Sequence, residues 1–285
     1  MKLSKKKGVS PIVATILMFT LILAAIGVSL VYMFPSIIQF KDNSYNNSVR
    51  LYFSALDSNI QNLLVNPPPQ AISFDYYQED GSLYFDNSKV VYFTLYDTAS
   101  SFSKSIIAEN LTRLVHKSTN VEDFEEGEHR YLKGPEDQDY LFINGSTKLY
   151  NDITVINETR TIFDPAYLYM SLYYRYCIDI DYRVVGTEEI FTIDIIHVSI
   201  NTNSDFGVEN TTKSIPLEIE FSGTEKISLE PIAFNSDLIG KANIYGEHHS
   251  LEEEQAVYVP VNTNYSFHYL YVNIIKININ INIVG

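Results

Sequence analysis

The stretch KKKGVSPIVATILMFTLILAAIGVSLVYMF, residues 5–34, decides the fold of this chain. Its residues 12–34 carry no charge, and as an α-helix they would extend roughly 35 Å, enough to cross the hydrocarbon core of a bilayer. Four lysines precede this segment: Lys2, Lys5, Lys6 and Lys7. The positive-inside rule places these lysines in the cytoplasm. We therefore expect a single-pass membrane protein whose C-terminal body faces outward.

The start of the apolar segment carries signals for a helix and for processing. Ser10 can cap the helix, and Pro11 suits its first position, where an amide hydrogen is not needed. Gly8 leaves the preceding backbone flexible and open, which a peptidase acting on the cytoplasmic side requires. The far end of the segment is bulky and lacks the small residues of an ordinary secretory cleavage site.

Together, these residues resemble the N-terminus of archaeal type IV pilins and pilin-like proteins. Their class III signal is a short basic leader, then Gly or Ala, then a V-S-P-like start to a long apolar helix. The resemblance implies that a membrane prepilin peptidase cleaves between Gly8 and Val9, and that the helix is retained. It also implies other pilin subunits as partners of that helix. Bacterial pilins carry Glu where this chain has Val13, so assembly through a charge at that position is not implied. The alternative is an uncleaved signal anchor.

We divide the chain into a leader (residues 1–8), a helical segment (9–66) and a head (70–285). Pro35 predicts a kink or break in the helix near the outer interface, and residues 41–48 read as a polar loop or weak helix. A second stretch has apolar residues at helical spacing: Val49, Phe53, Leu56, Ile60 and Leu63. Its other face is polar: Arg50, Asp57, Ser58, Gln61 and Asn62. We expect this amphipathic helix to pack on the head.

The head has the composition and the patterns of a β-protein. Segments 71–77 and 82–86 flank a turn ending in Gly81, which predicts a hairpin. Residues 103–116 fit either a helix or a strand, and residues 117–139 read as an acidic, solvated loop. Other strands are expected at 90–96, 140–143, 147–156, 166–183, 190–200, 215–221, 226–233, 256–261 and 265–284. In the last of these, Ile alternates with Lys or Asn over 275–283, which predicts one buried face.

The expected fold class is therefore α+β: a long N-terminal hydrophobic helix, the pilin stem, followed by a mainly antiparallel β-sheet or β-sandwich head. The net charge of −15 becomes −19 once the four leading lysines are set aside, since 16 basic residues then face 35 acidic ones. An acidic body repels nucleic acid, so no nucleic-acid partner is expected. Cys177 is the single cysteine, which excludes an intrachain disulfide, and we interpret it as a buried thiol.

Six sequons mark candidate glycosylation sites on an exported head. They begin at Asn46, Asn110, Asn144, Asn157, Asn210 and Asn264. This number is a mild excess over chance for a chain so rich in Asn, Ser and Thr. We expect some of the six to carry sugar.

No catalytic residue, metal site or cofactor is predicted. Glu247, His248, His249 and Glu252 form the one His/carboxylate cluster, which reads better as a polar turn than as a metal site. Asp179 and Asp181 share a strand face, but such pairs are common in acidic proteins. Loop 201–205 lacks the later bidentate Glu of a calcium loop. Because phosphate-loop, nucleophile-elbow, zinc and dinucleotide signatures are missing as well, we do not expect an enzyme.

These patterns favour a structural subunit of a type IV pilus-like surface filament, active in adhesion or surface contact. A minor or tip subunit fits the large head as well as a major one does. The expected localisation is the cell membrane, with the N-terminus cytoplasmic and the head extracellular, and the surface filament after processing. The alternative is a membrane-anchored extracellular module that binds a glycan or a surface protein through its Tyr-rich head. A tethered enzyme is the third and weakest interpretation.

Overall fold

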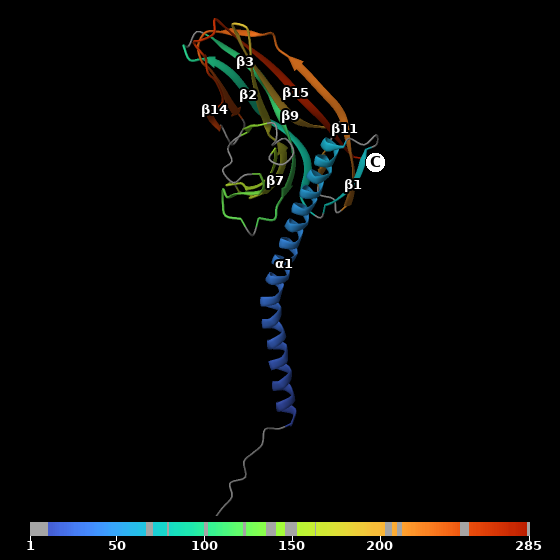
Figure 1. The fold of residues 1–285 in the computed structure, drawn as a ribbon. Coiled ribbons are helices and arrows are strands. Elements are labelled where there is room, and N and C mark those ends of the chain that lie inside the picture. The colour runs from blue at the N-terminus through green and yellow to red at the C-terminus, as the bar shows by residue number, and fades with distance from the viewer. Residues whose placement is uncertain are drawn as a thin grey trace, which may run out of the picture. The chain divides into compact units, whose positions relative to one another are not determined.

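The computed structural model describes most of the chain, with gaps: residues 11–66, 71–78, 80–99, 102–121, 124–134, 141–145, 153–162, 164–202, 207–209, 213–245 and 251–283. The chain divides into two compact units, Met1–Ser48 and Val49–Gly285. The described residues form one long helix followed by two mostly antiparallel β-sheets (Figure 1), which confirms the expected fold class.

Helix α1 (Pro11–Val65) is a single element of 55 residues that belongs to both units. It continues through Pro35, so a break at that residue is excluded, and residues 41–48 follow the helical alternative rather than the loop. Proline removes one backbone hydrogen bond, and the long helical segments on either side hold the axis together. The Ser36 hydroxyl donates to the carbonyl of Tyr32 at 3.2 Å, which adds a local contact beside the proline.

The first sheet, sheet A, has seven described strands, and two of its strand pairs are parallel. Its order is β1 (Ile72–Gln78), β11 (Lys213–Ser228), β15 (Phe267–Ile283), β9 (Glu188–Asn201), β8 (Tyr176–Val185) and β5 (Phe142–Asn144), and β12 (Ile232–Phe234) also pairs with β15. Strands β9 and β15 run parallel over 14 residue pairs, and β5 runs parallel to β8. The other pairs are antiparallel.

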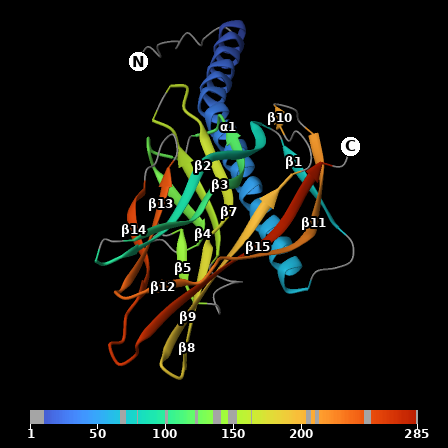
Figure 2. The same ribbon diagram turned by 90° about the horizontal axis from the view of Figure 1, so that it is seen from above.

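The second sheet, sheet B, is antiparallel throughout its eight described strands. Its order is β14 (Leu251–Val259), β13 (Leu238–Tyr245), β2 (Ser82–Asp97), β3 (Ser103–Ser118), β7 (Leu168–Tyr174), β6 (Thr154–Arg160) and β4 (His129–Lys133), and β10 (Gly207–Glu209) also pairs with β2. The view in Figure 2 separates sheet B from β9, β11 and β15 of sheet A.

The main hydrophobic core lies between the two sheets. It contains buried side chains from β2, β3, β13 and β14 of sheet B and from β5, β8, β9, β12 and β15 of sheet A. A row of aromatic rings crosses this core: Phe93 stacks on Phe142 at 5.2 Å, Phe142 on Tyr176 at 4.8 Å, and Tyr176 on His197 at 4.0 Å between centroids. Offset stacking of this kind adds to the free energy gained by burial alone.

Three strand predictions were wrong in ways that matter for the topology. Strands β1 and β2 flank Gly81 but belong to different sheets, so they do not form the predicted hairpin. Gly81 has the expected positive φ of 82° and lies against the carbonyl of Lys117. The predicted strand over 166–183 is interrupted at Arg175, where the chain passes from β7 in sheet B to β8 in sheet A. Part of the predicted acidic loop is strand β4.

Strand β15 buries the predicted Ile face over 275–283, at Ile279 and Ile281, but a different face before it. In its first half the even positions are buried, from His268 to Ile274, and Leu270, Val272 and Ile274 belong to the main core. Further along, the odd positions Ile279 and Ile281 are buried instead. A strand of 17 residues is long and twisted enough to meet different neighbours along its length, so the two halves bury opposite faces.

Candidate functional site

The N-terminal part of helix α1 is an uninterrupted apolar surface. Residues 12–40 carry no charge, and all of their side chains are exposed. As a helix this part is roughly 43 Å long, more than the thickness of a bilayer core. The hydroxyls of Thr20 and Ser36 donate to helix carbonyls one turn earlier, those of Ile16 at 2.8 Å and Tyr32 at 3.2 Å. The helix is therefore long and apolar enough to cross a membrane.

The C-terminal part of the helix, residues 49–65, is built into the β-domain. The five apolar residues predicted to face the head are buried: Val49, Phe53, Leu56, Ile60 and Leu63. Tyr52 contacts the rings of Phe74 and Tyr76 on β1, at 6.1 and 5.3 Å between centroids. This part of the helix therefore shares a hydrophobic core with the strands.

Some residues on the polar face of this segment make buried contacts with the β-domain. Asp57 is fully buried, and its carboxylate pairs with Lys133 of β4 and accepts hydrogen bonds from Thr154 at 2.8 Å and from Tyr174 at 3.0 Å. Burial, together with this carboxylate, raises the pKa of the Tyr174 hydroxyl well above its ordinary value. Neutral Tyr174 therefore stays a hydrogen-bond donor to Asp57.

A second ion pair joins the same segment to sheet B. Arg50 donates two hydrogen bonds to Glu158 of β6, at 2.6 and 2.8 Å, and the Glu158 side chain is fully buried. Gln61 donates to Thr154 at 2.8 Å. Sequence reasoning placed Arg50, Asp57 and Gln61 on the polar face but did not predict their partners, which lie 76 to 117 residues away in the chain.

The processing motif lies outside the described residues. This applies to the leader lysines Lys5, Lys6 and Lys7, to the cleavage pair Gly8 and Val9, and to Ser10. Pro11 is the first residue of helix α1. The predicted helix start at Ser10 and Pro11 therefore stays a prediction, since Pro11 is also the first residue that the structure describes.

The sequons lie on different parts of the fold. Asn110 on β3 and Asn264 in the turn before β15 are exposed, as an acceptor for a sugar must be. Asn157 on β6 is half-buried and accepts a hydrogen bond from Ser171. Asn46 lies within helix α1, Asn144 ends β5, and Asn210 lies outside the described residues. Asn110 and Asn264 are therefore the strongest candidates for glycosylation among the described sequons.

Within the described ranges, no three His, Cys, Asp or Glu side chains come together as a metal site. Glu247, His248 and His249 lie outside those ranges, and Glu252 belongs to β14. Asp179 and Asp181 lie on β8, with Asp181 exposed. Cys177 is fully buried.

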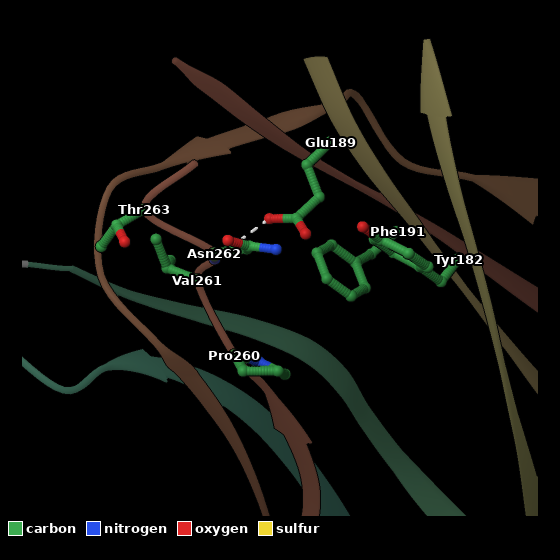
Figure 3. Close-up of a pocket in the computed structure, with 7 residues that line it drawn as sticks. All are labelled: Tyr182, Glu189, Phe191, Pro260, Val261, Asn262 and Thr263. Carbon is green, nitrogen blue, oxygen red and sulfur yellow. Dashed lines mark hydrogen bonds between the residues drawn. The ribbon is translucent and has the colours of Figure 1, made fainter. Parts of the chain in front are cut away.

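The β8–β9 end of sheet A has a shallow hollow of about 470 Å³, drawn in Figure 3. Tyr182 and Phe191 form one side, and residues 260–263 form the other. Between them lies the carboxylate of Glu189, which is held by the imidazole Nδ1 of His268 at 2.6 Å and by the backbone amide of Asn262 at 3.2 Å. Aromatic faces beside a fixed carboxylate can contact the apolar and hydroxyl faces of a sugar.

The sequence did not predict this hollow, because Glu189 and His268 are 79 residues apart and meet only through the parallel pairing of β9 with β15. Comparisons with known protein families, with curated proteins and with solved structures gave no match.

Proposed function

We propose that this chain is a pilin-like surface protein. In this proposal a prepilin peptidase removes residues 1–8, the apolar helix passes from the membrane into a filament, and the β-head is displayed outside the cell. The head serves adhesion or surface contact, as a minor or tip subunit or as the main one.

One observation carries the proposal: helix α1 is exposed and uncharged over residues 12–40, while its continuation over residues 49–65 is part of the core of the β-domain. An apolar helix of this kind is stable in lipid and equally stable in a bundle of identical helices. Transfer from membrane to filament therefore keeps the apolar surface away from water. Small residues such as Ala24, Ala25 and Gly27 permit close approach of neighbouring helices.

The test is the N-terminal residue of the mature chain, measured by intact mass and by N-terminal peptide sequencing on native membranes and sheared filaments. We expect a chain that begins at Val9. Gly8→Val should block cleavage and remove the protein from filaments, whereas Gly8→Ala, the matched control, should still be processed. A wild-type chain that begins at Met1 or Lys2 would overturn the proposal in favour of a plain anchor.

The hollow beside Tyr182 favours a second candidate function, a membrane-anchored module that binds a glycan. Its aromatic side wall and its fixed Glu189 carboxylate are the observations that support it. Under this proposal Tyr182→Ala reduces binding of the full-length protein to a glycan array, and Tyr92→Ala, an exposed tyrosine on sheet B, leaves binding unchanged. Equal glycan binding by the Tyr182→Ala and Tyr92→Ala variants would contradict the assignment of the hollow as a glycan site.

A further inference from the structure

In the part of the chain that the structure describes, no strand pairs with the outer edge of β8 beyond Ile178. Among the described residues, β5 covers this edge only from Tyr176 to Ile178, and β8 continues to Val185. Beyond that cover, the side chains of Ile180, Tyr182 and Val184 are 41, 46 and 40% exposed. They share one face of the strand, because side chains alternate with a period of two. The hairpin formed by β8 and β9 is at the foot of Figure 2.

The backbone along this edge is oriented outward. The amide of Tyr176 donates to the carbonyl of Leu141 at 2.9 Å, and the carbonyl of Ile178 accepts from the amide of Gly145 at 2.8 Å. Even-numbered residues of β8 therefore direct their backbone groups away from β9. By the same alternation, Ile180, Tyr182 and Val184 direct their amides and carbonyls outward, in the geometry that another strand needs. The Tyr182 amide donates to the Asp181 carboxylate at 2.9 Å, and pairing with another strand would replace this contact and free the carboxylate.

The charges on this edge favour pairing with a second copy of β8 in one particular register. Asp181 and Arg183 lie on the opposite strand face from Tyr182, and both are exposed. If a second β8 strand aligns antiparallel and centred on Tyr182, Asp181 of each copy lies opposite Arg183 of the other. In the same alignment Ile180 lies opposite Val184. Opposite charges and apolar pairs placed directly across a pair of strands are stabilising.

Other alignments are unfavourable. Centring the pair on Asp181 places that carboxylate opposite its own copy, and centring it on Arg183 does the same for the guanidinium. Like charges directly opposite each other are destabilising. Centring the pair on Ile180 places Asp179 opposite Asp181 twice. Charged residues on an edge strand normally prevent pairing with other chains, but here their signs favour one register.

We propose that two copies of this chain associate through antiparallel pairing of their β8 edges about a two-fold axis at Tyr182, which joins their A sheets into one. Such an interface is isologous, as in most homodimers. It forms six backbone hydrogen bonds from the two strands, two for each facing pair among Ile180, Tyr182 and Val184. The proposal does not rest on processing or filament formation, because it concerns the head alone.

The test is disulfide cross-linking of the full-length protein in detergent under mild oxidation. Tyr182 faces its own copy with Cα atoms about 5.5 Å apart, within the range of a disulfide. Tyr182→Cys should therefore give a covalent dimer. Val185→Cys is the matched control on the same exposed strand, since its two copies would be roughly 20 Å apart along the paired strands. The wild-type chain controls for the buried thiol of Cys177.

Charge reversal then tests the register. Adding Asp181→Arg to Tyr182→Cys should remove most of the dimer, and adding Arg183→Asp as well should restore it. Resistance to protease shows whether each variant is folded. If Tyr182→Cys is less resistant than the wild type, the Ile180→Cys/Val184→Cys double variant replaces it, because position 180 of one copy faces position 184 of the other. The proposal is overturned if Val185→Cys cross-links as well as Tyr182→Cys, if the folded variants do not cross-link, or if the double reversal does not restore the dimer.

Discussion

At the scale of single residues, two buried histidines connect the sheets. His116 on β3 shares a hydrogen bond of 2.9 Å with the Tyr76 hydroxyl on β1, and Asp80 is the charge that acts on it. His197 on β9 lies 3.8 Å from the Glu109 carboxylate on β3, with Lys276 close by. Burial lowers the pKa of each imidazole from 6.5 to about 4, and this effect outweighs the nearby carboxylates.

These histidines predict a loss of stability in mild acid. Between pH 6.5 and about 4 the unfolded chain binds protons that the folded chain does not, so the free energy of unfolding decreases as the pH falls through this window. Each histidine contributes up to about 1.4 kcal/mol per pH unit there. Melting temperatures of the full-length protein at pH 7.5 and 5 measure the effect.

His116→Gln removes one of the two titrating groups, so it should reduce the pH dependence of the melting temperature. His129→Gln, at an exposed position, should leave that dependence unchanged. An unchanged dependence in His116→Gln would show that the pKa of this histidine is the same in the folded and the unfolded chain.

At the scale of secondary-structure elements, the attachment of helix α1 to the β-domain depends on buried charge. We expect Asp57→Ala to lower the free energy of unfolding by about 2–4 kcal/mol, since breaking a buried ion pair leaves its partners without compensation. Because the Lys133 side chain is partly exposed, water can hydrate its ammonium group in the variant, so we expect a loss near the lower end of this range. Ser58→Ala, the adjacent exposed residue, is the control.

Chemical denaturation of the full-length protein in detergent, followed by tyrosine fluorescence, compares the two variants. Equal midpoints for Asp57→Ala and Ser58→Ala would contradict the role assigned to the Asp57 carboxylate.

Elements also show how far the sequence could predict the structure. The helix and most strands carry strong periodic patterns, so their existence was predicted correctly. The pairing of the strands could not be predicted, because it joins residues far apart in the chain, as between β1 and β11. The break at Arg175 was missed because apolar and aromatic residues continue on both sides of it. Asp57 was misplaced because helical periodicity identifies an apolar face but not a buried ion pair.

At the scale of the whole molecule, the aromatic row through the main core holds the two sheets together. Phe142 touches Phe93 of sheet B and Tyr176 of sheet A. Tyr176 also donates to Glu109 at 2.7 Å, and Lys276 pairs with the same carboxylate. Partial burial raises the pKa of Glu109, but the hydrogen bonds from Lys276 and Tyr176 outweigh it and keep the pKa below its ordinary value.

Removal of the central ring should weaken the association of the sheets. We expect Phe142→Ala to destabilise the protein by about 3–5 kcal/mol, through lost burial and a residual cavity, and Phe142→Leu to cost less. Thermal unfolding of the full-length protein measures both. If the alanine variant were no less stable than the leucine variant, the side chains around Phe142 would have to close the cavity completely.

The central place of β15 in sheet A has a consequence for export. Strands β9 and β11 both pair with β15, and the parallel pairing with β9 joins residues 79 positions apart, such as Glu189 and His268. If the head is exported as we propose, β9 and β11 cross the membrane before β15 and expose unpaired edges until β15 follows. Pairings of such long range form slowly. Under the proposed function, the nascent head would then pass through a stage prone to aggregation, and a chaperone on the outer face of the membrane would improve its yield.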